Sequence, residues 1–274
     1  RTYAVFGGNP AYLTLVDSNL SLQENIDHLL LQRGSPLYDE ARYVLQQEIR
    51  EPRNYFSILH SIASGHTRLN EIKLATGLEG AHVYLDYLQK LQLVERMVPL
   101  TEQQPLKSRK GIYRIQDPYL RFWFRFIYSN RTALERGARQ PVLENIIMPD
   151  IDEYTNEAFT EICLQYFHAS GHADRLPFVP KAIGKWWNNQ KEIDLVVLGD
   201  SLAEIVDCVW GIQPVGTSRL VDLEKKASLI RSDLPEFEIR YGLCSRSGFT
   251  RQLVDVAHQR SDVSLYPLKK ILKM

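Results

Sequence analysis

Residues 151–274 alternate between helical and extended patterns, and the order of these patterns constrains the fold more than any other feature of the chain. A helical pattern near 153–167 precedes strand patterns at 191–198 and 202–210, which Gly199 and Asp200 join as a hairpin turn. Helical patterns near 219–230 and 248–258 then alternate with strand patterns at 237–244 and 263–267. The order α-β-β-α-β-α-β predicts an α/β domain with a mixed central sheet flanked by helices.

The middle of the chain has a different order. Three short helical patterns near 55–63, 68–76 and 80–91 are followed by a strand pattern at 93–99, a polar loop at 101–110 and a returning strand at 111–115. This order predicts a winged helix-turn-helix. The aromatic run at 119–128 has large rings on every helical face, which predicts a buried helix between domains. Base stacking by these rings is the alternative.

The first 52 residues predict a small helical lead-in. Gly7, Gly8, Asn9 and Pro10 mark a turn, and amphipathic helices are expected near 21–32 and 38–50. We therefore expect an α+β chain in three parts: residues 1–52, residues 53–150 with the aromatic linker helix, and the α/β domain of residues 151–274.

Composition excludes several classes of protein. The chain has 33 Lys and Arg against 33 Asp and Glu, so a polycation and a disordered acidic tail are both excluded. It has no apolar run long enough to predict a membrane span, no signal-peptide pattern, and no initiator Met, which predicts a fragment of a longer chain. Cys163, Cys208 and Cys244 match no zinc-binding spacing and predict small core residues in a reducing, cytoplasmic protein.

Two acidic residues in the predicted hairpin are the candidates for chemistry. Asp194 lies in the first strand and Asp207 in the second, so both carboxylates can share one face of the sheet. Such a pair repels unless a proton or cation joins it, and a divalent ion such as Mg²⁺ held there could support phosphodiester hydrolysis. The alternative is that each acid is solvated at a strand end or paired with a neighbouring Lys or Arg.

A family resemblance extends over nearly the whole chain. The motifs that carry it lie at residues 7–13, 58–65, 84–91, 94–96, 113–123 and 187–194. In this order they resemble the C-terminal half of a prokaryotic, archaeal-type AAA ATPase fused to a winged helix and a PD-(D/E)xK nuclease-like domain of uncharacterised function. The resemblance implies that residues 1–52 end an ATPase lid. It also implies that ATP binds only in an upstream domain, since this chain has no Walker A motif.

The resemblance also assigns expected positions in the nuclease-like motif, which reads Asp, a hairpin, then Glu-x-Lys-Trp. Asp194 matches the first Asp, Asp207 takes the Glu position and Trp210 matches the Trp. Val209 stands in the Lys position, where it can neither orient a water molecule nor neutralise a phosphate. The departure predicts a degenerate, restriction-endonuclease-like domain.

Further positions bear on the same site. Thr160 stands where the family has an acid on the upstream helix, which leaves Glu161 as the candidate third catalytic acid. Lys225 or Lys226 on the following helix could supply a cation that has moved from the strand.

The preferred function is a DNA-associated module of an ATPase-type protein. In this interpretation the cations of the polar loop and of the third helix contact the DNA backbone: Lys107, Arg109, Lys110 and Lys90. One alternative is a metal-dependent DNA endonuclease that uses Asp194, Asp207 and Glu161. The other is a protein-interaction or regulatory module without DNA binding, whose partner is an ATPase domain or subunit.

Overall fold

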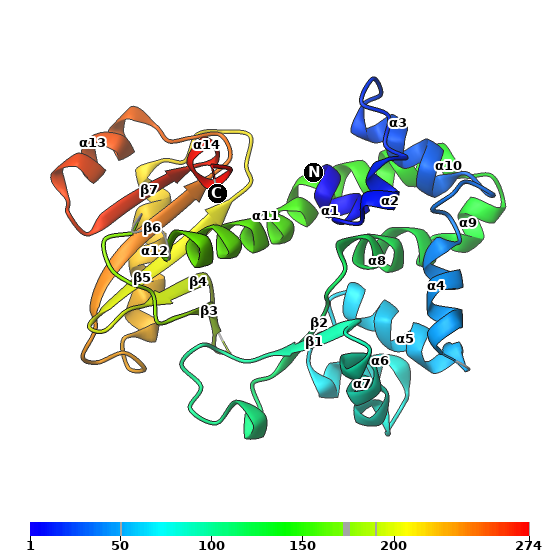
Figure 1. Ribbon diagram of the computed structural model, residues 1–274, viewed down its shortest axis with the longest axis horizontal. Coiled ribbons are helices and arrows are strands. Elements are labelled where there is room, and N and C mark those ends of the chain that lie inside the picture. The colour runs from blue at the N-terminus through cyan, green and yellow to red at the C-terminus, as the bar shows by residue number, and fades with distance from the viewer. Residues whose placement is uncertain (50, 172–175, 190, 274) are drawn as a thin grey trace. The chain divides into compact units, whose positions relative to one another are not determined.

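The computed structural model describes residues 1–49, 51–171, 176–189 and 191–273. The chain divides into two compact units (Figure 1). The first contains residues 1–97 and 111–154, and the second contains residues 98–110 and 155–274. Within the described residues, no helix has the length and apolar character that a membrane span requires.

Short helices open the first unit: α1 (Thr2–Phe6), α2 (Pro10–Leu13), α3 (Leu22–Ile26), the π-helix η1 (Asp27–Leu31) and α4 (Glu40–Glu48). The turn expected at residues 7–10 separates α1 from α2, and the Asn9 Oδ1 caps α2 by accepting from the amide N of Ala11 at 3.0 Å. The Ser21 Oγ and the Glu24 carboxylate form a capping box at the start of α3.

Three helices and a two-stranded antiparallel sheet follow in the order that the sequence predicts. They are α5 (Pro52–Ala63), α6 (Leu69–Thr76), α7 (Ala81–Lys90), β1 (Val94–Met97) and β2 (Ile112–Ile115). Gly77 ends α6 in the left-handed conformation, with φ of 69°. The apolar side chains of Leu59, Ile72, Leu85 and Leu88 are fully buried, and they hold the three helices together.

The aromatic run forms α8 (Pro118–Phe122) and the π-helix η3 (Trp123–Tyr128). The Trp123 Nε1 donates to the carbonyl of Tyr38 at 2.7 Å, and the ring of Phe124 meets that of Phe56 at 5.4 Å. These contacts lie within the first unit, and the buried rings leave no face for stacking on bases. The rings are buried as expected, apart from the half-buried Tyr128, but they are buried within one unit and not between domains. The buried rings are not available for base stacking. The unit continues with α9 (Arg131–Glu135), α10 (Arg139–Val142) and η4 (Leu143–Ile147).

The second unit is built on a five-stranded sheet. Its elements are α11 (Met148–Gly171, which begins in the first unit), β3 (Ala182–Trp187), β4 (Glu192–Leu198), β5 (Leu202–Val209), α12 (Thr217–Ile230), β6 (Glu238–Ser245), α13 (Arg251–Gln259), β7 (Val263–Pro267) and α14 (Leu268–Ile271). The strands pair in the order β3-β4-β5-β6-β7. The first three are antiparallel, and β6 and β7 are parallel to β5. The predicted fold class, an α+β chain with a mixed central sheet, is confirmed.

The sequence did not predict β3. This strand lies at the edge of the sheet, and four of its six residues are only partly buried, so it lacks the alternation of a half-buried strand. Gly184 weakens the pattern further, although its missing side chain has a use: a Cβ there would lie 3.2 Å from the Leu100 Cδ1.

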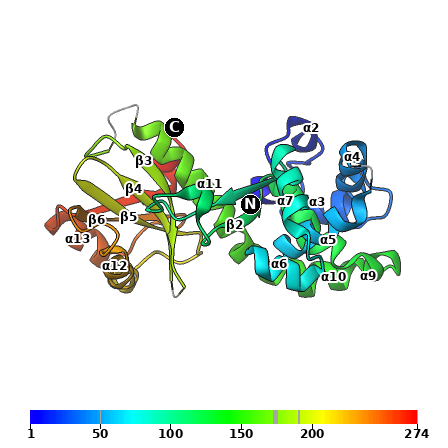
Figure 2. The same ribbon diagram turned by 90° about the horizontal axis from the view of Figure 1, so that it is seen from below.

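Helices cover both faces of the sheet (Figure 2). On one face, α12 and α13 enclose a core with Leu220, Leu223 and Leu253. On the other, α11 and α14 enclose a core with Phe159, Phe167 and Ile271. The second unit therefore has three layers, with the sheet between two layers of helices.

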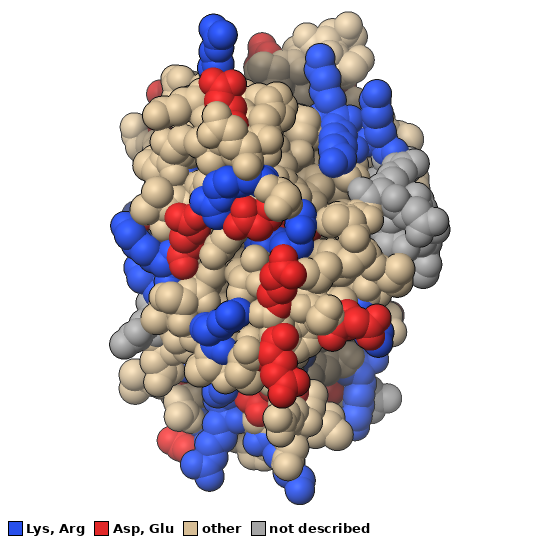
Figure 3. Space-filling model, turned by 90° about the vertical axis from the view of Figure 1, so that its left-hand side faces the viewer, with Lys and Arg blue, Asp and Glu red and all other residues tan. Residues whose placement is uncertain are grey.

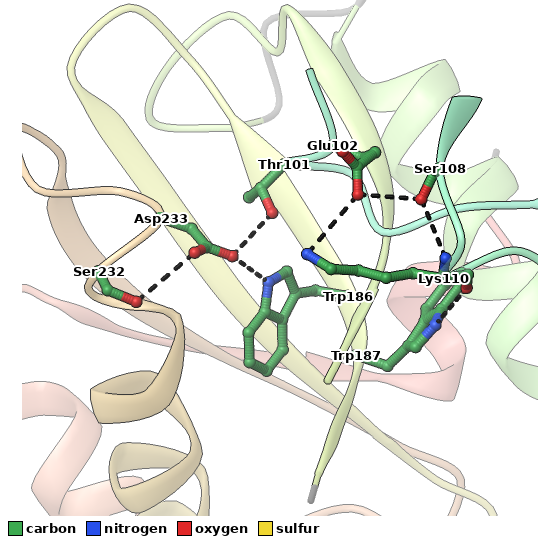
Figure 4. Close-up of polar contacts among 8 residues, drawn as sticks. All are labelled: Thr101, Glu102, Ser108, Lys110, Trp186, Trp187, Ser232 and Asp233. Carbon is green, nitrogen blue, oxygen red and sulfur yellow. Dashed lines mark hydrogen bonds and ion pairs between the residues drawn. The ribbon is translucent and has the colours of Figure 1, made fainter. Parts of the chain in front are cut away.

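Residues 98–110 connect β1 to β2 and pack on β3 (Figure 4). The amide N of Leu100 donates to the carbonyl of Lys185 at 2.9 Å, and the Trp187 Nε1 donates to the carbonyl of Lys110 at 3.0 Å. The Asp233 Oδ2 accepts from both the Trp186 Nε1 at 2.8 Å and the Thr101 Oγ1 at 2.9 Å. The predicted wing loop is thus a fixed part of the second unit.

Candidate functional site

An irregularity in β4 sets the position of Asp194. The register between β3 and β4 shifts between Gly184 and Trp186, which pair with Val196 and Ile193. Ile193 and Val196 therefore face the same core although three positions separate them. A bulge of this kind redirects the side chains within it, and Asp194 lies inside it.

The Asp194 carboxyl lies where the pairing of β4 with β5 ends. The last paired residues are Leu195 and Val206, and the Asp194 Oδ2 accepts from the amide N of Cys208 at 2.7 Å. Burial, followed by the neighbouring Cys208 and Asp207, raises the pKa of Asp194 to about 7. At neutral pH this carboxyl is therefore divided between its protonated and ionised forms.

Asp207 lies on β5, and its charge is balanced by side chains of α12. Its side chain is only 4% exposed. The Arg219 Nε approaches the Asp207 Oδ2 at 2.5 Å, and the second oxygen receives the Arg219 guanidinium at 3.3 Å and the Lys226 ammonium at 3.5 Å. Two cations thus balance the charge of one buried carboxylate.

The charges of Asp194 and Asp207 interact. Asp207 and Lys226 both act on the ionisation of Asp194, so the two carboxyls share one electrostatic environment. For Asp207, the arrangement also matches the alternative drawn from the sequence, in which a neighbouring Lys or Arg neutralises an acid of the pair.

The cations beside Asp207 come from α12. Val209 lies two residues after Asp207, on the same face of β5, and packs against the core under α12. Of the two candidates, Lys226 contacts Asp207, whereas Lys225 is exposed and pairs with Asp222 at 3.2 Å. The site therefore contains a lysine, contributed by a different element from the one in the family motif.

Sequence reasoning missed Arg219. A signal was present, because Arg219 and Lys226 lie seven positions apart on one helix and therefore face the same way. A second signal was Asp207 itself, since an acid in an apolar strand requires a cationic partner.

The residues present do not fit Mg²⁺ well. Mg²⁺ requires free carboxylate oxygens, and both oxygens of Asp207 are already engaged by Arg219 and Lys226. Glu161 lies on α11, and among the described residues it does not join Asp194 and Asp207 in a group of three donors within 4.8 Å. The catalytic role of Glu161 and the metal site at the two aspartates stay predictions.

The predicted DNA-contacting cations lie in different units. Lys90 ends α7 in the first unit and is exposed. Lys107 and Arg109 are exposed on the loop of the second unit, and Lys110 pairs with Glu102 at 3.6 Å. In the view of Figure 3, basic and acidic side chains are interspersed, so that face has no continuous patch of one sign. The contact of these cations with DNA stays a prediction.

The fold and the site together define an α+β protein with a mixed five-stranded sheet whose β4 and β5 carry two acidic residues. Residues 123–213 match the model of the family DUF234, described as "Archaea bacterial proteins of unknown function". The uncharacterised protein MJECL04 of Methanocaldococcus jannaschii is 30% identical over 250 residues, which are 89% of this chain and 55% of that protein. The chain thus spans about half the length of this curated relative.

Two solved structures are also similar over most of the chain. One is Can2 from Sulfobacillus thermosulfidooxidans in complex with cyclic tetra-adenylate, with a TM-score of 0.27, 11% identity, and coverage of 86% of this chain and 54% of that one. The other is protein VC1899 from Vibrio cholerae, with a TM-score of 0.28, 12% identity, and coverage of 87% and 54%. At these scores the likeness carries no argument about function.

Proposed function

We propose that this chain is a DNA-associated module whose winged helix and loop cations contact the DNA backbone, and whose nuclease-like domain no longer cleaves DNA. The proposed loss of cleavage rests on one observation: Arg219 and Lys226 contact both carboxylate oxygens of Asp207. A carboxylate whose charge is balanced by two protein cations is a poor ligand for a divalent ion. We further propose that the module works with an ATPase domain or subunit, as the family resemblance implies.

The proposed contact with the DNA backbone is supported by the loop of residues 98–110. Lys107 and Arg109 are exposed, and hydrogen bonds to Lys185 and Trp187 of β3 and to Asp233 after α12 anchor the loop. An anchored loop loses little conformational entropy when it contacts a phosphate backbone. Contacts of this kind are independent of sequence and weaken steeply as salt is added.

A gel-shift titration at several salt concentrations tests DNA binding. We expect the Lys107→Ala/Arg109→Ala variant to bind more weakly, with the slope of log affinity against log salt reduced by about 2. Lys110 is left in place because it pairs with Glu102. The control is Lys181→Ala/Lys225→Ala, which removes two exposed cations of the same unit. Equal loss in both variants would show that only net charge matters and would remove the loop from the proposal.

Nicking of supercoiled plasmid tests the loss of cleavage. We expect the wild-type protein in Mg²⁺ or Mn²⁺ to nick no faster than Asp194→Ala purified in parallel. Nicking that requires Asp194 would contradict the proposal, whatever the result of the gel shift.

A metal-dependent endonuclease is the second candidate, and one specific observation favours it. The Lys226 ammonium lies 3.5 Å from Asp207, so the site retains a lysine beside its acids. If this candidate is correct, nicking is lost in both Asp194→Ala and Lys226→Ala, and Lys225→Ala on the adjacent position keeps full activity. Nicking that survives Lys226→Ala would exclude this role for the lysine.

A further inference from the structure

All three cysteines of the chain meet in the core of the second unit. Cys163 comes from α11, Cys208 from β5 and Cys244 from β6, and each is buried. Their three Sγ atoms lie within 4.8 Å of one another. Among the described residues, no other group of three or more Cys, His, Asp or Glu side chains has its ligand atoms this close together.

The sheet and α11 determine this convergence. Cys208 and Cys244 are direct partners in the parallel pairing of β5 with β6, so both side chains leave the same face of the sheet. α11 covers that face and inserts Cys163 between Phe159 and Phe167. Three residues far apart in sequence, one from each of three elements, therefore contribute their sulfurs to one cluster.

We infer that Cys163, Cys208 and Cys244 form a site for a thiophilic divalent metal ion of the Zn²⁺ type. A metal at the centre of three sulfurs with Zn–S bonds of normal length needs sulfurs about 4 Å apart. The observed upper limit of 4.8 Å requires only a small contraction of the triad. Soft thiolate ligands favour such ions over hard ions such as Mg²⁺.

Electrostatics favours a divalent over a monovalent ion. Three thiolates with a divalent ion leave one net negative charge, whereas a monovalent ion leaves two, and buried net charge is costly.

The three thiols differ in how readily they lose a proton. Burial alone raises the pKa of Cys163, but the thiols of Cys208 and Cys244 outweigh it and lower that pKa to about 6. Burial raises the pKa values of Cys208 and Cys244. Metal binding would therefore release protons chiefly from these two residues, and affinity should rise with pH.

Packing alone is the competing explanation, because free cysteine often serves as a small buried apolar residue. Packing does not require the sulfurs to converge, and a non-thiol residue of similar size would serve equally well. The two explanations differ in what happens when Zn²⁺ is added.

The test uses reduced, metal-free full-length chain with Zn²⁺ alone as the probe. We expect equilibrium dialysis to find one Zn²⁺ per chain, and Cys163→Ser, Cys208→Ser and Cys244→Ser each to weaken binding at least about tenfold. Co²⁺ should give a sulfur-to-cobalt absorption band in the wild type only. Val206→Ala, which removes apolar volume from the same layer without removing a thiol, is the matched control and should still bind one Zn²⁺.

A second measurement keeps the inference testable if the serine variants do not fold. Zn²⁺ should slow alkylation of the three wild-type thiols under mildly denaturing conditions, and Mg²⁺ should not. Wild-type chain that binds no Zn²⁺ when reduced would overturn the inference. So would a count of one thiol per denatured chain purified without reductant, because it would indicate a disulfide between two of the three cysteines.

Discussion

Two aspartates of one hairpin, Asp207 buried and Asp194 partly buried, have different electrostatic surroundings. Arg219 and Lys226 contact both oxygens of Asp207 and balance its charge. Asp194 has one hydrogen bond from the amide N of Cys208, and burial raises its pKa to about 7. The difference follows from the partners that α12 offers, because its two cations are directed at Asp207 and act on Asp194 only from a distance.

The raised pKa of Asp194 predicts an unusual dependence of stability on pH. The unfolded carboxyl loses its proton near pH 4, whereas the folded carboxyl keeps it until about pH 7. Between these values the folded state binds more protons, so the free energy of unfolding falls as pH rises, by roughly 2–4 kcal/mol in all. Urea unfolding at pH 4 to 8 should show this fall in the wild type relative to Asp194→Asn.

The matched control for this measurement is Asp255→Asn, which replaces an exposed carboxyl on α13 of the same unit. The difference between wild type and this control should stay flat over the same pH range. A flat difference between wild type and Asp194→Asn would contradict the raised pKa.

At the scale of elements, the sequence predicted most of the second unit. The observed β5 (Leu202–Val209), α12 (Thr217–Ile230) and β6 (Glu238–Ser245) lie within two residues of the expected ranges. These elements have clear periodicity because each buries one face or lies inside the sheet. The edge strand β3 was missed because partial burial leaves no such pattern.

The candidate site was predicted only in part. The position of Asp194 and Asp207 just beyond the paired part of one hairpin could be expected, because a short hairpin fixes the register of its two strands. Arg219 and the cysteine triad were not expected, since each depends on how helices pack against the sheet. Contacts between residues far apart in sequence leave little local signal.

The ion pairs between α12 and β5 predict a graded set of losses. Arg219→Ala removes two contacts from a buried carboxylate and should cost roughly 1–3 kcal/mol of unfolding free energy. Lys226→Ala removes one longer contact and should cost less. Lys225→Ala, next along the helix and exposed, is the control and should stay within about 0.5 kcal/mol.

Adding Asp207→Asn to Arg219→Ala completes a double-mutant cycle measured by urea unfolding. The cost of Arg219→Ala should shrink in the Asp207→Asn background, because no charge is then left buried without its guanidinium. An unchanged cost would show that Arg219 contributes through packing of its side chain and not through the ion pair.

At the scale of the whole molecule, one segment belongs to a different unit from the residues that flank it in sequence. Residues 98–110 lie between two strands of the first unit in sequence but belong to the second by their contacts. The reason lies in side chains that the sequence pattern does not connect: Asp233 after α12, and the two tryptophans of β3 (Figure 4). The position of the loop cations therefore depends on the second unit.

Asp233→Ala should release this loop. The change removes the acceptor for the Thr101 hydroxyl and for the Trp186 Nε1, whose residue is 2% exposed, so an unpaired buried donor should cost roughly 1–3 kcal/mol. Lys107, Arg109 and Lys110 lie in the released segment and are sites for trypsin, so limited proteolysis should cut there several-fold faster. Hydrogen exchange should rise in peptides from residues 98–110 and 182–187, with the helices of the first unit unchanged.

Ser232→Ala, which removes only a 3.5 Å contact to the same carboxylate, is the control. Faster exchange throughout both units would mean that Asp233 supports the whole chain and does not specifically anchor the loop.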